Sequence, residues 1–186
     1  MATHNRHKVV EVARILAPLG VVVEALPEEV ELPPEVGETF AENALGKAHA
    51  AAARTGRPAI GDDSGIEAAA PGGRPGVRSA RFAGPTATDE ENLARLISEV
   101  PPGTALRYVC VVAYATPEGE AELFLGTCDG RMSHERRGSR GFGYDPVFVP
   151  EEDPQQRTMA ELAEAEKDAI SHRGRAVRAL AAWLGG

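Results

Sequence analysis

The sequence predicts an α/β fold built from one sheet with helices around it. Segments with helical spacing of apolar residues alternate with short apolar runs typical of strands, and three segments begin with the Thr-x-x-Glu pattern of a capping box. This alternation is typical of α/β domains. Gly and Pro are spread along the 186 residues without a linker, repeat or charge block between them. We therefore expect a single domain over residues 1–186.

The first third of the chain is expected to supply helices and strands in turn. Residues 8–16 predict a helix, residues 21–26 a short strand, and residues 39–54 a helix capped at its start and ended by a glycine. Residues 58–61 are too short for anything but a strand. They deliver Asp62, Asp63 and Ser64 at its carboxyl end, where open α/β sheets usually bind ligands.

The rest of the chain predicts a hairpin between helices. A capped helix opens at Thr88, and residues 106–115 and 121–128 are β-rich runs joined by a Pro-Glu-Gly turn, which favours an antiparallel hairpin and hence a mixed sheet. Thr158 and Glu161 predict a short capped helix, and residues 171–184 predict the last one.

Composition excludes several classes of protein. Apolar residues make up 42% of the chain, and 28 Asp+Glu against 20 Lys+Arg give a formal net charge of -8, which lacks the basic excess of a nucleic-acid or anionic-membrane binder. No apolar run approaches the roughly 18 residues of a membrane span. Cys110 and Cys128 lie in apolar runs without metal-ligand spacing. We interpret them as buried thiols in a reducing cytoplasm, with a single disulfide as the alternative.

Acidic residues form the densest polar constellation. Glu35, Glu38 and Glu42 precede or begin a helix, and Asp62 and Asp63 follow a strand. Converging carboxylates repel one another unless a cation lies between them, and hard oxygen ligands suit Mg²⁺. Taken singly, Glu38 and Glu42 are also explained as solvated charges at a helix start. Two adjacent acids after a buried strand cost desolvation, so we interpret Asp62 and Asp63 as functional.

Two further sets suit a nucleotide. Thr3-x-Asn5-x-x-Lys8 stands at a helix start, where backbone N–H groups can hold phosphate, although this motif taken alone favours a simple cap with a solvated lysine. The stretch 141–146, Gly-Phe-Gly-Tyr-Asp-Pro, lets an aromatic ring approach a flat ligand, and Lys167, His172 and Arg173 follow as donors. A Gly-rich turn and a basic helix start are the alternative.

These motifs together resemble the inosine triphosphate pyrophosphatase family, which includes the bacterial non-canonical purine NTP pyrophosphatases. The resemblance covers nearly the whole chain. It rests on six motifs in register, namely Thr3-x-Asn5-x-x-Lys8, Glu35-x-Gly37-x-Thr39-Phe40-x-Glu42-Asn43-Ala44-x-x-Lys47-Ala48, Asp62-Asp63-Ser64-Gly65, Gly73-x-Pro75-Gly76-Val77-x-Ser79-Ala80-Arg81, the 141–146 stretch and Ser171-His172-Arg173.

The resemblance implies a homodimeric enzyme, with one Mg²⁺ per subunit, that hydrolyses ITP, dITP and XTP to the nucleoside monophosphate and pyrophosphate. It also implies an elongated mixed sheet flanked by helices, with two lobes and the substrate cleft between them. Glu35 and Asp63 would bind Mg²⁺, and Asp63 would also be the catalytic proton acceptor. The substrate-binding residues would be Thr3, His4, Asn5, Arg6, His7, Lys8, Ser64, Phe142, Gly143, Tyr144, Asp145, Lys167, His172 and Arg173.

The chain departs from the family pattern at its start, because only Met1 and Ala2 precede Thr3 where a short apolar strand is usual. Two other functions use the same residues. A phosphohydrolase with these acids and a metal would release orthophosphate, and a nucleotide-sensing module would bind without turnover. The carboxylates exceed what binding alone needs, which favours the pyrophosphatase.

Overall fold

The computed structural model describes residues 1–70 and 72–186, which group into two compact units. Unit 1 comprises residues 1–64, 110–126 and 172–186, and unit 2 comprises the described residues of 65–109 together with 127–171. Three strands contribute residues to both units: β1 (Ala59–Ala68), β2 (Ala105–Ala115) and β3 (Ala121–Met132). That the whole chain is a single domain stays a prediction.

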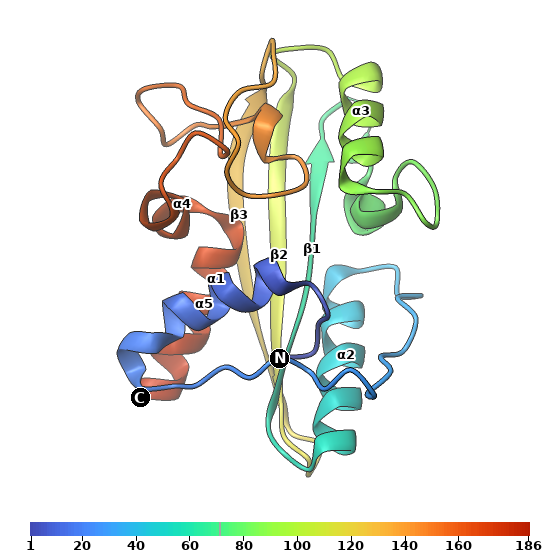
Figure 1. The fold of residues 1–186 in the computed structure, drawn as a ribbon, viewed down its shortest axis with the longest axis vertical. Coiled ribbons are helices and arrows are strands. Elements are labelled where there is room, and N and C mark those ends of the chain that lie inside the picture. Colours follow the sequence, from blue (N-terminus) through green and yellow to red (C-terminus); the bar gives the residue numbers. More distant parts are fainter. Residues whose placement is uncertain (71) are drawn as a thin grey trace. The chain divides into compact units, whose positions relative to one another are not determined.

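The strands form one antiparallel sheet in the order β1-β2-β3-β4, where β4 is Phe148–Pro150. The expected mixed sheet is therefore wrong. Figure 1 labels the first three of these strands. β2 starts beside the end of β1, since the Ala69 amide donates to the Ala105 carbonyl at 3.0 Å, and so β2 runs back along β1. The hairpin of β2 and β3 is confirmed, and its turn is closed by the Thr116 amide donating to the Glu120 carbonyl at 2.9 Å.

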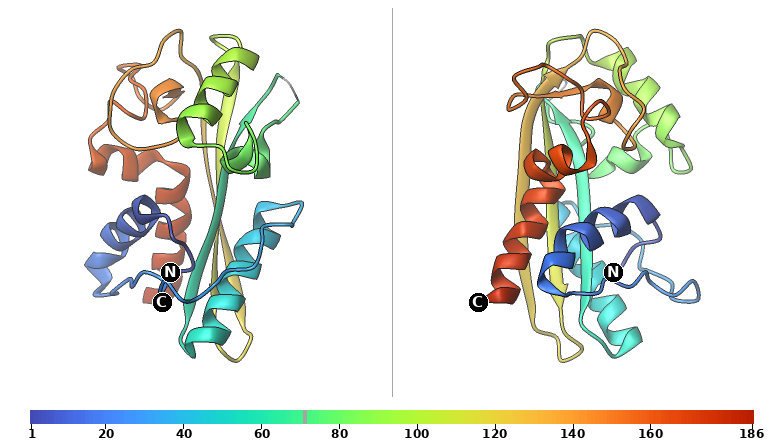
Figure 2. Two further views of the ribbon diagram at one scale, coloured as in Figure 1. Left: turned by 45° about the vertical axis from the view of Figure 1, so that its right-hand side comes forward. Right: turned by 60° about the vertical axis from the view of Figure 1, so that its left-hand side comes forward.

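Unit 1 carries helices α1 (Arg6–Leu16), α2 (Phe40–Thr55) and α5 (His172–Gly185), with the 3₁₀ turn η1 (Ala17–Leu19) after α1. Figure 2 shows α1 and α5 on one face of the strands and α2 on the other. α2 crosses β1 closely, because a Cβ at Gly61 would lie 2.8 Å from the Ala48 amide nitrogen. One buried hydrophobic cluster of unit 1 comprises Val12, Leu16, Cys110, Val112, Ala176, Val177 and Leu180.

The start of α2 confirms the predicted capping box. Thr39 Oγ1 accepts from the Glu42 amide at 3.2 Å, and Glu42 Oε2 accepts from the Thr39 amide at 3.1 Å. Gly56 ends the helix with φ 65°, a conformation that favours glycine.

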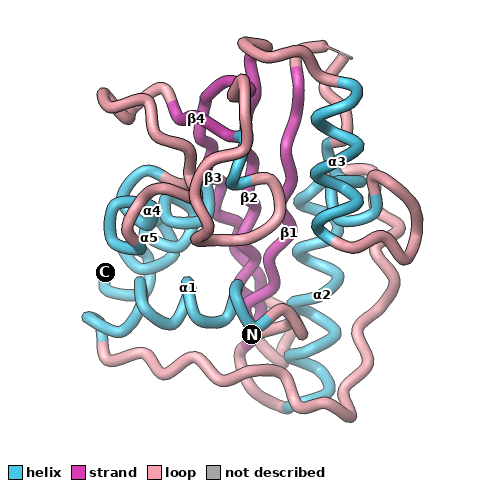
Figure 3. Tube along the Cα trace, turned by 45° about the horizontal axis from the view of Figure 1, so that its top comes forward, coloured by secondary structure: helices cyan, strands magenta, loops and turns pink. Residues whose placement is uncertain are grey.

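The expected strand at residues 21–26 is wrong, and this stretch belongs to the long loop between α1 and α2 (Figure 3). Val21 and Val23 pack against the core of unit 1, while Val22 is 82% exposed. Apolar packing and exposure do alternate along Val21, Val22 and Val23, as in a strand. This segment packs on one side against unit 1, but it is not assigned as a strand.

Unit 2 carries α3 (Asp89–Glu99), α4 (Glu164–Ile170) and the 3₁₀ turns η2 (Gly76–Arg81) and η3 (Asp145–Val147). Thr88 caps α3 as predicted. The largest fully buried side chains of its core are Ile66, Leu93, Leu96, Val100, Val147, Phe148, Met159 and Leu162.

The short helix expected after Thr158 is a turn instead. The Thr158 amide donates to Glu161 Oε2 at 2.7 Å as in a cap. The following backbone bonds elsewhere, because the Met159 amide donates to the Phe148 carbonyl and the Ala160 carbonyl accepts from the Arg140 amide. These tertiary bonds replace helical ones, and α4 begins only at Glu164.

Cys110 and Cys128 are both buried cysteine thiols, as expected. Within the described part of the chain, no helix is both long and apolar enough to cross a membrane.

Candidate functional site

The two adjacent acids lie inside a strand rather than at its end. β1 continues through Asp62, Asp63 and Ser64 to Ala68, so the expected strand end at residue 61 is wrong. Consecutive strand residues point to opposite faces. Asp62 is fully buried and Asp63 is 4% exposed. Each therefore requires partners for its charge on its own side of β1.

Asp62 is neutralised by cations from both ends of the chain. Its Oδ2 lies 3.1 Å from Lys8 Nζ and accepts from Nε and Nη2 of Arg173 at 3.3 Å each. Burial favours the protonated form, but Lys8 and Arg173 outweigh it and hold the pKa of Asp62 well below its ordinary value. Arg173 also donates to Glu11 Oε2 at 2.6 Å and to Ser64 Oγ at 2.9 Å. Asp62 is thus a permanent anion that orders two of the predicted substrate-binding residues.

Asp63 has side-chain partners on α2, and its Oδ1 also accepts from the Ser64 amide at 3.1 Å. Asn43 Nδ2 donates to Asp63 Oδ2 at 3.0 Å, and Lys47 Nζ lies 3.7 Å from Asp63 Oδ1 and 2.7 Å from Glu35 Oε1. Asn43 and Lys47 are one helical turn apart, which places both on the same face of α2. Burial raises the pKa of Asp63, and the charge of Glu35 adds to this against the opposing effect of Lys47.

Glu35 and Asp63 fit the expected Mg²⁺ site. The Lys47 ammonium bridges the two carboxylates, which shows that this position accommodates a cation. A cavity of about 260 Å³ adjoins it, lined by Glu35, Asn43 and Lys47 among others. Within residues 1–70 and 72–186, no three His, Cys, Asp or Glu side chains are grouped to hold a metal. Two carboxylates suffice for Mg²⁺, which usually keeps several waters and takes substrate phosphates as its other ligands.

Glu42 is not part of this carboxylate pair. Its Oε2 accepts from the amides of Glu38 at 2.8 Å and Thr39 at 3.1 Å, so it serves the helix start. The interpretation of Glu42 as a charge at the start of α2 is therefore confirmed.

The N-terminal motif is ordered by local hydrogen bonds. Asn5 caps α1, with Oδ1 accepting from the His7 amide at 3.0 Å, and Thr3 Oγ1 accepts from the Asn5 amide at 3.1 Å. The Ala2 amide donates to the Ile60 carbonyl at 2.7 Å, which ties the segment to β1 without a strand. His4, Arg6 and His7 are exposed. Lys8 forms an ion pair with Asp62. The expectation that this lysine is solvated is therefore wrong, whereas the cap is present at Asn5.

In unit 2, Phe142 and Lys167 lie around Asp145. Asp145 Oδ2 accepts from Lys167 Nζ at 2.8 Å and from the Phe142 amide at 3.0 Å, and Oδ1 accepts from the hydroxyl of Tyr108 at 3.2 Å. Lys167 Nζ lies 5.0 Å from the centroid of the Phe142 ring. The buried carboxylate of Asp145 thus holds the 141–145 loop in shape. Tyr144 is 7% exposed and donates to the Ser79 carbonyl at 2.7 Å.

His172 and Arg173 open α5 in unit 1 and are 6% and 2% exposed. Sequence reasoning missed Glu11 and Tyr108, because each lies in an apolar periodic run that predicts only a helix face or a strand core. Asn43 belongs to a recognised motif, yet its role became visible only through its contact with Asp63.

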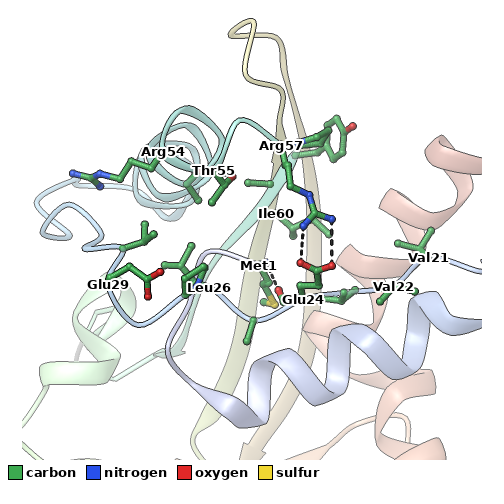
Figure 4. A pocket seen from close by; sticks show the side chains of 18 of the residues that line it. Met1, Val21, Val22, Glu24, Leu26, Glu29, Arg54, Thr55, Arg57 and Ile60 are labelled. Carbon is green, nitrogen blue, oxygen red and sulfur yellow. Dashed lines mark hydrogen bonds and ion pairs between the residues drawn. The ribbon is translucent and has the colours of Figure 1, made fainter.

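A larger cavity, of about 670 Å³, lies elsewhere in unit 1 (Figure 4). The loop after α1, the end of α2 and the start of β1 line it, and the Arg57–Glu24 ion pair at 2.6 Å borders it. None of the predicted site residues lines this cavity. The candidate site is therefore identified by its residues and their contacts, and not by the size of a cavity.

Comparison with known proteins agrees with the motifs. The chain is 46% identical over 188 residues to a dITP/XTP pyrophosphatase of Cutibacterium acnes (97% of this chain, 92% of that protein) and 49% identical over 197 residues to one of Frankia alni (99% and 95%). Among solved structures, a HAM1 protein from Coxiella burnetii matches with a TM-score of 0.85 and 38% identity (98% and 95% of the two chains). A sequence model of the Ham1 family matches residues 1–183. This chain belongs to the Ham1 family.

Proposed function

We propose that this protein hydrolyses the non-canonical purine nucleoside triphosphates ITP, dITP and XTP to nucleoside monophosphate and pyrophosphate. One observation carries the proposal: the carboxylates of the half-buried Glu35 and the buried Asp63 both approach Lys47 beside a cavity. The similarity to dITP/XTP pyrophosphatases over almost the whole chain supports the substrate class. The proposal includes a homodimer in the cytoplasm with one Mg²⁺ per subunit.

Hydrolysis of a phosphoanhydride needs positioning and neutralisation of charge more than covalent chemistry. Mg²⁺ held by Glu35 and Asp63 would supply positive charge to phosphate oxygens. The raised pKa of Asp63 makes its carboxylate a better acceptor of the proton from the attacking water. Lys47 contacts both acids and, together with Lys8, would take up negative charge on the leaving pyrophosphate.

Selection of the base is assigned to fixed hydrogen-bond donors. The buried contacts of Arg173 with Asp62 and Glu11 hold its guanidinium in one orientation. A donor fixed in this way would pair with the 6-keto oxygen of hypoxanthine or xanthine and oppose the 6-amino group of adenine. Such mismatches can discriminate by roughly 10⁴–10⁵ where a buried polar group is left unpaired. The loop of Phe142 and Asp145 would contribute the stacking surface.

One assay tests the proposal. The purified chain is incubated with ITP, dITP, XTP, ATP and GTP, with and without Mg²⁺, and both products are identified by chromatography. Release of pyrophosphate from ITP, dITP and XTP that requires Mg²⁺ is the expected result. Orthophosphate release would favour a terminal phosphohydrolase, and binding without turnover would favour a nucleotide sensor. Light scattering of the eluting protein checks the dimer separately.

A further inference from the structure

Asn43 links the loop that carries Glu35 to the strand that carries Asp63. Its side chain is 5% exposed. The amide oxygen accepts from the backbone N–H of Gly37 at 2.9 Å, and the amide nitrogen donates to Asp63 Oδ2 at 3.0 Å. Gly37 is two residues from Glu35. One side chain therefore contacts both halves of the proposed metal site without itself being an ionisable ligand.

The close approach at Gly37 depends on the absence of a side chain there. A Cβ at this position would lie 2.7 Å from Asn43 Oδ1 and 2.8 Å from the Cβ of Glu42. Both distances are shorter than van der Waals contact, and neither atom belongs to the end of a long flexible side chain. Gly37→Ala would therefore push the loop, and Glu35 with it, away from Asn43.

The chain contains a second asparagine in the same local setting. Residues 39–43 read Thr-Phe-Ala-Glu-Asn and residues 88–92 read Thr-Asp-Glu-Glu-Asn. In both, the threonine and glutamate form a capping box and the asparagine stands four residues after the cap, in α2 and in α3 (Figure 1). Asn92 is 2% exposed and ties its own preceding loop by accepting from the Ala83 amide at 2.8 Å and donating to the Ala80 carbonyl at 3.1 Å.

The two asparagines differ in one contact. Asn92 Nδ2 bonds to a backbone carbonyl, whereas Asn43 Nδ2 is 3.5 Å from the Gly37 carbonyl and directs its shorter bond to the Asp63 carboxylate. Asn43 and Asn92 thus each bind the loop that precedes their own helix, which is a structural role. The contact with Asp63 is an addition at Asn43, and it fixes the orientation of a carboxylate that would ligate the metal.

We propose that Asn43 is a positioning residue that sets the relative placement of Glu35 and Asp63 and thereby the affinity of the site for Mg²⁺. This rests on the proposed function, because the two carboxylates must act as metal ligands for it to hold. Groups that orient ligating carboxylates typically change metal affinity or activity by roughly 10–100-fold when they are removed.

Calorimetric titration of the purified full-length chain with Mg²⁺ alone tests the inference. We expect Asn43→Ala and Gly37→Ala each to weaken Mg²⁺ binding by about 10-fold or more. The effects should be less than additive in the double variant, because both break one linkage. In turnover assays with ITP, Asn43→Ala should raise the Mg²⁺ concentration for half-maximal rate while the rate at saturating Mg²⁺ largely recovers. Asn92→Ala is the matched control and should lower the melting temperature without changing Mg²⁺ affinity.

The outcomes separate this inference from the proposed function. Wild-type Mg²⁺ affinity in Asn43→Ala, or an equal loss in Asn92→Ala, would overturn the positioning role while leaving the metal site in place. Should Asn43→Ala fail to fold, Gly37→Ala carries the test alone, and unchanged Mg²⁺ affinity in it would reject the role. A wild-type chain that binds no Mg²⁺, or a Glu35→Gln variant that binds it equally well, would overturn the proposed metal site and this inference with it.

Discussion

Asp62 and Asp63 are neighbours in β1, yet their carboxyl groups have pKa values shifted in opposite directions. Both are almost completely buried, so burial alone would raise both. Lys8 and Arg173 contact Asp62 within 3.3 Å and reverse the effect, whereas Lys47 approaches Asp63 only to 3.7 Å while also pairing with Glu35. Because consecutive strand residues point to opposite faces, Asp62 meets two cations and stays ionised, whereas Asp63 has the raised pKa that suits a proton acceptor.

Asp63→Asn is expected to abolish most turnover while the chain stays folded. The amide has nearly the shape of the carboxylate, but it cannot accept the proton of the attacking water. Loss of a general base typically lowers the rate by roughly 10²–10⁴-fold. The measurement is kcat for ITP at saturating Mg²⁺, together with the melting temperature. A variant with kcat close to that of the wild type would remove Asp63 from the catalytic role.

Asp62→Ala is expected to lower the stability of the chain. It leaves Lys8 and Arg173 without their shared anion, and removing one partner of a buried ion pair typically costs about 3–5 kcal/mol. Urea unfolding gives the free energy. Glu90→Ala is the control, since the Glu90–Arg136 pair is exposed and such pairs contribute little to stability. Equal losses in the two variants would contradict the structural role of Asp62.

The sequence predicted the elements that depend on local signals. The caps of α2 and α3 and the β2–β3 turn rest on side chains a few residues apart, and all three are confirmed. The sequence-based prediction was wrong where contacts with distant parts of the chain determine the local structure. β1 continues through two aspartates because cations from remote segments neutralise them, and the turn at Thr158 is set by backbone bonds to β4 and to Arg140.

The candidate site shows the same division. The motifs identified Glu35, Lys47 and Asp63, which the structure brings into contact. Glu11 was not identified, because a single acid on a helix looks like a surface charge until its partner is known. That partner, Arg173, is 162 residues away in the sequence.

Tyr108→Phe is expected to weaken the support of the 141–145 loop. It removes a donor to the buried Asp145 carboxylate, and a buried group that loses a partner typically costs about 1–3 kcal/mol. Because Phe142 is proposed to contact the base, we expect KM for ITP to rise while kcat changes little. Tyr114→Phe is the control, since Tyr114 packs on Trp183 in unit 1. An unchanged KM and melting temperature in Tyr108→Phe would show that the hydroxyl does not support the loop.

Cys110 is expected to make stability fall at alkaline pH. Burial raises the pKa of its thiol to about 12, whereas an unfolded thiol titrates near 8.5. Between these values the unfolded chain releases a proton that the folded chain retains, so the free energy of unfolding decreases as pH rises, by up to about 1.4 kcal/mol per pH unit. Below the unfolded pKa both states hold the proton and the thiol adds no slope. Cys110→Ala removes this contribution, so its stability deficit relative to the wild type should shrink between pH 8.5 and 10.5 in urea titrations. A deficit that stays constant over this range would show that Cys110 ionises equally in both states.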